Sequence, residues 1–200
     1  TSIISRNVSE ASNPDYARRS AVLSSTAPGA RIAEIRRATN AVLFRQNLAA
    51  ISGAEAQSVL AERLDSLRIR VNGADNAASP AAALGALQEA LQTYAATPSN
   101  RTLATAAVEA ARGMVRSLNE GAAVVQSFRA EADRDIAAAV NDLNRLLGEF
   151  ETANRQVVAG TRTGQDVSDA LDRRDALLKQ ISAVVPVSVI TRADDDVILT

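Results

Sequence analysis

Apolar residues recur every three or four positions through the second half of the chain. Starting near Ser99 or Asn100, this spacing continues to about Val158 and predicts one helix of roughly 60 residues, about 90 Å long. From Leu118 onward the spacing is close to a heptad repeat. Arg129 and Asn154 occupy seam positions of this repeat. The apolar stripe contains Leu103, Val108, Val115, Leu118, Ala122, Val125, Ala132, Ile136, Ala139, Leu143, Leu147, Phe150 and Val157.

The same periodicity predicts three shorter helices. The first runs from Ala30 to Val71 and is stopped by the Asn72-Gly73 loop signal. The second starts at Ser79-Pro80, an N-cap followed by proline, and ends before Thr97-Pro98-Ser99. A loop over 160–164 follows the long helix. The last helix is capped by Asp166 or Ser168 and stopped by Pro186. We expect the long helix to bury its stripe against the first and last of these helices.

The two ends of the chain lack this periodicity. Residues 1–30 are predicted to be irregular, with turns at Asn13-Pro14-Asp15 and Ala27-Pro28-Gly29 and an extended stretch over 17–25. At the other end, β-branched residues at 187–190 and 197–199 flank the polar turn 194–196 and predict a β-hairpin. An isolated hairpin is marginally stable in water, so we expect it to begin a larger β domain that is truncated here.

These elements predict a mainly α fold, an elongated helical bundle around one very long central helix, with a β-hairpin at its C-terminal end. We expect a helical domain over 1–185, including the irregular N-terminal segment. Residues 186–200 are expected to start an outer β-rich domain.

Composition supports long helices side by side rather than a thick globular core. Hydrophobic residues make up 46 % of the chain but aromatic residues only 2 %, so much of the apolar fraction is alanine. Alanine favours helix and buries little surface. The net charge of -1 gives no electrostatic basis for nucleic-acid binding. No apolar run approaches the length of a membrane span, so no membrane contact is expected.

The chain has no histidine and no cysteine, so the usual nucleophile–base pairs and most zinc sites cannot form. Asp194, Asp195 and Asp196 lack the ligand spacing of a calcium loop and are predicted to form a solvated turn. The charges at 129–135 of the long helix are predicted to form i,i+4 surface pairs. No cofactor, metal site or enzymatic activity is expected.

Two clusters leave alternatives open. The polar stretch with Asn7, Val8 and Ser9, followed by Tyr16 and Arg18, is either a specific ordered linker or an ordinary surface loop. The helix around Asp172, Arg174, Asp175 and Leu177 carries either a solvated charged face or charges that reach a neighbouring helix. Spacing alone favours the simpler alternative in each case.

Taken together, the clusters resemble a known family. Residues 4–22, ISRNVSEASNPDYARRSAV, resemble the N-terminal region of flagellar rod, hook and hook-associated axial proteins, with Asn7, Val8, Ser9, Tyr16 and Arg18 on matching positions. Asp15 replaces a usual glycine. Residues 168–189, SDALDRRDALLKQISAVVPVSV, are similar to a segment of the hook-associated protein 1 family of the first hook–filament junction. The matching positions are Asp172, Arg174, Asp175, Leu177, Ile181, Val187 and Val189, while Arg173 departs from a usual glutamine.

The resemblance implies a structural protein of the bacterial flagellum, required for flagellum assembly and located extracellularly after export through the flagellar channel. Its implied partners are identical subunits in a ring, the hook protein and the second hook–filament junction protein. The present segment is expected to be monomeric or weakly associating. The alternatives are a flagellin-like or second junction protein, or an intracellular helical coiled-coil module that binds a partner helix.

Overall fold

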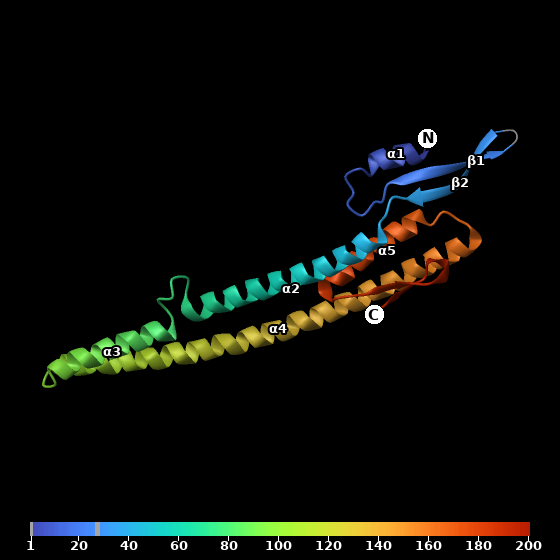
Figure 1. The fold of residues 1–200 in the computed structure, drawn as a ribbon. Coiled ribbons are helices and arrows are strands. Elements are labelled where there is room, and N and C mark those ends of the chain that lie inside the picture. The colour runs from blue at the N-terminus through green and yellow to red at the C-terminus, as the bar shows by residue number, and fades with distance from the viewer. Residues whose placement is uncertain (1, 27–28) are drawn as a thin grey trace. The chain divides into compact units, whose positions relative to one another are not determined.

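The computed structural model describes residues 2–26 and 29–200 (Figure 1). The chain is mainly helical, with one very long helix and a C-terminal β-hairpin, so the predicted fold class is confirmed. Its described residues form two compact units: the first unit comprises 1–57 with 139–200, and the second unit comprises 58–138. The elements are α1 (Ser2–Ser9), β1 (Arg19–Thr26), β2 (Gly29–Arg37), α2 (Ala41–Asn72), α3 (Pro80–Ala96), α4 (Arg101–Thr163), α5 (Ser168–Val184), β3 (Val189–Thr191), a 3-10 turn (Ala193–Asp195) and β4 (Val197–Leu199).

The long helix α4 begins where the sequence predicts and ends five residues later than expected. Asn100 caps its start, because the Asn100 Oδ1 accepts the backbone N–H of Thr102 at 2.9 Å. The predicted loop over 160–164 is wrong, because the helix continues to Thr163 and closes in a Schellman turn. Gly164 has a φ of +68°, and the N–H of Gln165 donates to the Gly160 carbonyl at 2.9 Å.

The predicted helix over 30–71 is only partly correct. Residues 29–37 form strand β2, which pairs antiparallel with β1, and helix α2 begins at Ala41. Ile32 and Ile35 have the three-residue spacing of a helix face, but short apolar runs do not distinguish helix from strand. Pairing with β1 satisfies the backbone hydrogen bonds of this segment. A shift of register between Val22 and Leu23 interrupts the regular pairing opposite Ile32 and Glu34. The extended stretch predicted before this segment is confirmed as β1, whereas Ala27 and Pro28 of the predicted turn lie outside the described residues.

Local signals at the end of α2 and at the start of α3 are confirmed. Helix α2 stops at Asn72, and Gly73 takes a φ of +76° directly after it. Ser79 caps α3, since its hydroxyl accepts the Ala82 N–H, and Pro80 is the first helical residue. Helix α5 begins at Ser168, and Asp166 Oδ1 accepts both the backbone N–H and the hydroxyl of Ser168. The N-cap of α5 is Val167, which makes no side-chain cap hydrogen bond, and not Asp166 or Ser168 as predicted.

The apolar core of the first unit lies where α2, α4, α5 and the C-terminal hairpin meet. Helices α4 and α5 contribute most of the buried side chains, α2 contributes one and strand β4 contributes one. The described core residues are Leu48, Leu146, Phe150, Ala153, Leu177, Leu178, Ile181 and Val197. In the last part of the predicted stripe Phe150 and Val157 are buried as expected, whereas Leu147 is 37 % exposed and its neighbour Leu146 is buried.

In the second unit the earlier part of the predicted stripe is not a buried seam, which corrects the sequence expectation. Val108, Val115 and Leu118 of α4 are 50 %, 56 % and 49 % exposed. The better-covered positions precede them by one residue, at Ala107, Met114 and Ser117. Helix α4 contacts its neighbours through small residues, such as Gly121 against Val71 and Pro80, and leaves the bulkier stripe outside.

The charges on α4 also differ from the prediction. Instead of pairing along their own helix, Glu131 pairs with Arg70 at 2.7 Å, and Asp135 pairs with Arg63. Both arginines belong to α2, so these ion pairs join two helices of the second unit. Arg129 is exposed.

The C-terminal hairpin is confirmed as β3 and β4, which pair antiparallel with Ile190 opposite Ile198. The polar turn between the strands is anchored to the end of α4. Asp194 pairs with Arg162 at 2.7 Å, and Asp196 accepts a 2.7 Å hydrogen bond from the Asn154 amide.

Candidate functional site

The N-terminal stretch predicted to be irregular is ordered around Asn7. The Asn7 side chain reaches from α1 to the first residue of β1, where its Nδ2 donates to the Arg19 carbonyl at 2.8 Å. Its Oδ1 accepts the Arg19 N–H at 2.9 Å and the Tyr16 hydroxyl at 2.8 Å. One amide thus holds helix, turn and strand together, as the ordered-linker alternative requires.

Tyr16 also contacts Arg19, the neighbour of the motif residue Arg18. The Arg19 guanidinium lies over the Tyr16 ring, 5.0 Å from its centroid. Arg18 is exposed, and its carbonyl accepts the Ala38 N–H at 2.8 Å. Val8 is exposed, and the Ser9 hydroxyl donates to the Arg6 carbonyl. The structure therefore brings Asn7 and Tyr16 together, but not Val8 or Arg18.

Asp15 fits its position without the backbone freedom of the glycine that it replaces. Outside glycine, positive φ angles in the described residues occur at Asn76, Asp194 and Asp195, not at Asp15. The Asp15 N–H donates to Asn13 Oδ1, which closes an Asx-turn. Its carboxylate pairs with Lys179 of α5 at 2.9 Å.

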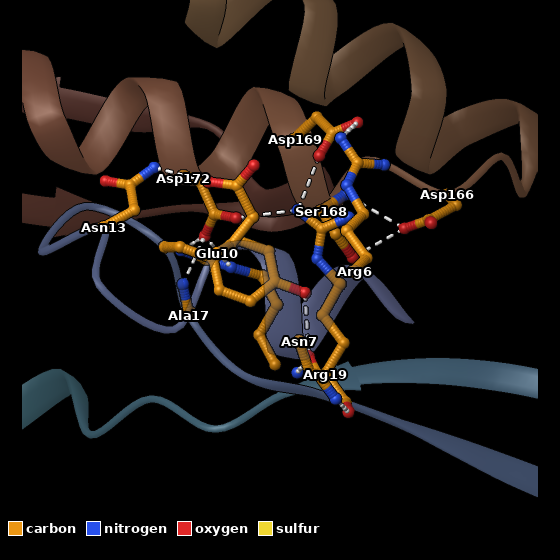
Figure 2. A network of polar contacts seen from close by, with 12 residues as sticks. Arg6, Asn7, Glu10, Asn13, Ala17, Arg19, Asp166, Ser168, Asp169 and Asp172 are labelled. Carbon is orange, nitrogen blue, oxygen red and sulfur yellow. Dashed lines mark hydrogen bonds and ion pairs between the residues drawn. The ribbon is translucent and has the colours of Figure 1, made fainter. Parts of the chain in front are cut away.

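Helix α5 presents three carboxylates at three-residue steps, a carboxylate row of Asp169, Asp172 and Asp175 (Figure 2 draws the first two). Asp172 lies at its centre and accepts from two arginines on different strands. The Arg19 Nη2 lies 2.7 Å from one of its oxygens, and the Arg37 Nη2 lies 2.6 Å from the other. The outer carboxylates extend the row through Asp169–Arg6 at 2.8 Å, Asp169–Arg19 at 2.5 Å and Asp175–Arg37 at 2.7 Å.

This network is largely removed from water at its centre. The side chains of Arg19 and Asp172 are 4 % and 12 % exposed, whereas Asp169 is 61 % exposed. Burial acts to lower the pKa of Arg19, but hydrogen bonds to Asp172 and Asp169 outweigh it and raise the pKa above its ordinary value. Burial acts to raise the pKa of Asp169, and its bonds to Arg19 and Arg6 reverse this and lower it.

Arg174 serves a different contact of the same helix. Its Nη1 donates to Asn154 Oδ1 of α4 at 2.9 Å and to the Asp195 carbonyl of the C-terminal turn at 2.5 Å. The side chain is buried, and burial lowers its pKa, partly offset by the nearby charge of Asp175. Leu177 lies in the apolar core. The solvated-face alternative is therefore wrong for Asp172 and Arg174. Arg173 is 63 % exposed, and its Nη2 lies 3.9 Å from a carboxylate oxygen of Glu149 on the neighbouring helix α4.

The arrangement makes α5 a structural joint. Asp172 and Asp175 bind the strands of the N-terminal hairpin, Arg174 binds α4 and the C-terminal hairpin, and Leu177 faces the core. Within the described residues no group of three potential metal-binding side chains is gathered. In that same part of the chain no helix is long and apolar enough to cross a membrane.

Comparison with known families decides the identity. The family model of the flagellar hook-associated protein FlgK helical domain matches residues 68–200, about two thirds of the chain. The chain belongs to this family. FlgK-type proteins are structural components of the bacterial flagellum, where they assemble with other flagellar components. No curated protein matches the chain in a direct comparison. The matched range includes the carboxylate row and Arg174 but not Asn7 or Tyr16.

Sequence reasoning missed four of the six residues in this ion-pair network. Arg6, Arg19, Arg37 and Asp169 are partners that were not among the candidate residues. Arg19 stands beside the predicted Arg18, and in a strand adjacent side chains point to opposite faces. Only one of the two arginines can therefore face α5, and the sequence does not indicate which.

Proposed function

We propose that this protein forms the junction between hook and filament of the bacterial flagellum and is required for flagellum assembly. The observation that carries the proposal is the match of residues 68–200 to the FlgK helical domain, with the family-like segment of α5 placed as the joint of the first unit. In this role the protein is exported through the flagellar channel. It then forms a ring of identical subunits between hook protein and the second junction protein.

The exposed stripe of α4 supports a role in packing against other subunits. Val108, Val115, Leu118, Val125 and Ile136 are between 39 % and 62 % exposed, and all belong to one helix of the second unit. Clustered exposed aliphatic residues usually mark a protein contact. We assign this stripe to lateral contacts between identical subunits.

The carboxylate row and Asn7–Tyr16 supply the second requirement of a junction subunit, a defined geometry. The carboxylate row connects segments far apart in the sequence, and Asn7–Tyr16 connects neighbouring segments; both do so through hydrogen-bonded side chains rather than through apolar packing alone. Such directional contacts fix orientation more tightly than non-directional apolar burial does. We propose that Asn7, Tyr16, Asp172, Arg174 and Asp175 act in packing and assembly, not in catalysis.

The decisive experiment is deletion of the gene followed by electron microscopy of the flagella. We expect hooks without filaments, with unpolymerised filament protein in the medium and rescue by the complete gene. Normal filaments in the deletion strain contradict the proposal and favour an intracellular binding module. Absence of hooks points to an earlier rod or hook role, and hooks with no filament protein in the cells or the medium point to the filament protein itself.

A further inference from the structure

The N-terminal lobe, defined as residues 2–26 and 29–37 with α1, β1, β2 and the segment between α1 and β1, does not share the apolar core of the first unit. The core residues, and the partly buried residues packed on them, all lie at or beyond Phe44. Among the lobe residues whose burial is described, Arg19 alone is buried, and it is a charged residue. Apolar burial is the main non-directional force that holds a fold together. The lobe is attached to the helices by other means.

Those means are polar contacts to one face of α5. Positions 169, 172, 175 and 179 follow one another at three- and four-residue steps and meet the lobe in turn. Figure 2 shows the first two of them beside Arg6 and Arg19. The described contacts are Arg6–Asp169, Arg19–Asp169, Arg19–Asp172, Arg37–Asp172, Arg37–Asp175, Lys179–Asp15, Lys179 to the Pro14 carbonyl, and the Ala17 N–H to Asp172.

The chain between lobe and helices does not depend on these contacts. Residues 38–40 are exposed and connect β2 to α2. Asn40 caps α2 by itself, because its Oδ1 accepts the N–H groups of Val42 and Leu43, both at 3.0 Å. Helix α2 therefore keeps its start when the lobe moves, and residues 38–40 provide a short hinge.

We propose that the lobe is a strap that ionised carboxylates hold on α5, and that it opens as a unit on acidification while the helical core stays folded. The carboxylate of Asp172 is the centre of this latch. The charged groups that face it are Arg19 from β1 and Arg37 from β2, with Asp169 and Asp175 beside it on α5. Arg6 of α1 acts on Asp169, and Tyr16 covers Arg19.

The physical basis is the asymmetry of buried ion pairs. An ionised pair offsets its own desolvation, but removal of one charge leaves the other buried without compensation. Loss of the Asp172 charge leaves two guanidinium groups buried without full compensation, since the side chains of Arg19 and Arg37 are 4 % and 11 % exposed. Both regain water if the lobe departs. Bonds to Arg19 and Arg6 outweigh burial and lower the pKa of Asp169, the neighbouring carboxylate of the latch, so we expect opening below the ordinary carboxyl range, under about pH 4.

Distance measurement between lobe and α5 tests the proposal directly. Because the chain has no cysteine, spin labels at Ser25→Cys in β1 and Ala183→Cys in α5 are unique, and both positions are exposed. We expect one narrow distance population at pH 7 and a broad one below about pH 4. Helical circular dichroism of the same samples should stay constant through this change. The proposal is overturned if the pH 7 distance population and the helical signal disappear together. It is also overturned if the distance distribution stays constant down to pH 3.

Three substitutions separate the latch from general acid effects. Asp172→Asn should produce the broad distance distribution already at pH 7, and Asp172→Glu should keep the narrow one because it retains the charge. Asp142→Asn is the matched control, since Asp142 pairs with Arg145 on its own helix and is half exposed. An Asp172→Asn protein that remains closed at pH 7 contradicts the latch even if it is otherwise stable.

Discussion

Arg174 of α5 and Asn154 of α4 form a 2.9 Å hydrogen bond that joins a buried cation to a neutral amide. Among the described residues no carboxylate oxygen lies within ion-pair distance of Arg174; its other acceptor is the Asp195 carbonyl. Asn154 in turn bonds both backbone groups of Val197, with its Oδ1 3.1 Å from the N–H. The amide therefore connects helix, helix and hairpin, and its loss leaves a buried charge poorly satisfied.

Asn154→Ala should lower the free energy of unfolding by about 2–3 kcal/mol, because partners in a partly buried site lose their hydrogen bonds. Urea denaturation followed by circular dichroism measures this. Asn144→Ala, at an exposed position of the same helix, is the control and should change stability by less than about 0.5 kcal/mol. Equal effects at the two positions would show that the Asn154 contacts contribute nothing particular.

Two glycines of α4 should respond to alanine with opposite sign. A Cβ at Gly160 would lie 2.3 Å from the Val167 Cγ1, so Gly160→Ala should destabilise by about 1–3 kcal/mol despite its better helix propensity. A Cβ at Gly148 meets nothing within 4 Å, and Gly148→Ala should stabilise by about 0.5–1 kcal/mol. Melting temperatures of both variants test this pair. The double variant Gly160→Ala/Val167→Ala should recover part of the loss; no recovery would locate the strain elsewhere.

Asp169 should titrate below the ordinary range of aspartate, because hydrogen bonds from Arg19 and Arg6 outweigh the effect of burial on its pKa. A carboxyl whose pKa is lower in the folded state contributes stability above its unfolded pKa, and this contribution disappears as pH falls through the folded pKa. The window therefore lies below about pH 4. Carbon-detected NMR titration of the carboxyl gives the pKa. Arg6→Ala should raise it, and an unchanged value would show that Arg6 does not act on Asp169.

The apolar stripe of α4 should drive weak self-association at high concentration. Sedimentation should show the protein as mostly monomeric with a concentration-dependent rise in mass. Val115→Glu/Leu118→Glu should abolish the rise, since each carboxylate would enter the contact unpaired. Arg116→Glu, on a neighbouring exposed position, is the control for added negative charge. Association that survives the double substitution would place the contact on another surface.

Helix positions could be predicted from the sequence where the signal is local. Asn100, Ser79 and Gly73 start or stop helices through bonds to their nearest neighbours, and these ends are where the pattern places them. The end of α4 was missed because Gly160 was interpreted as a loop residue. A glycine is needed at position 160 because the Val167 side chain packs against it, and no pattern along the chain reveals that contact.

Side-chain partnerships were predictable only in part. The segment around Asp172 was marked by its resemblance, but its partners Arg19 and Arg37 lie more than 130 residues away. Strand β2 was interpreted as helix, so Arg37 was not expected in an extended hairpin facing α5. The prediction of a buried seam along α4 was wrong for a related reason. Periodicity shows that a helix face is apolar, but it does not show that a neighbouring element covers that face.

The turn at Gly164 has a consequence for the whole first unit. Its φ of +68° belongs to the left-handed region, where a side chain is strained, and this one torsion reverses the chain from α4 into α5. The direction of α5 decides the order in which its acidic side chains are displayed. The turn at this glycine thus fixes the order in which α5 meets the N-terminal segment, from Asp169 beside Arg6 to Lys179 beside Asp15.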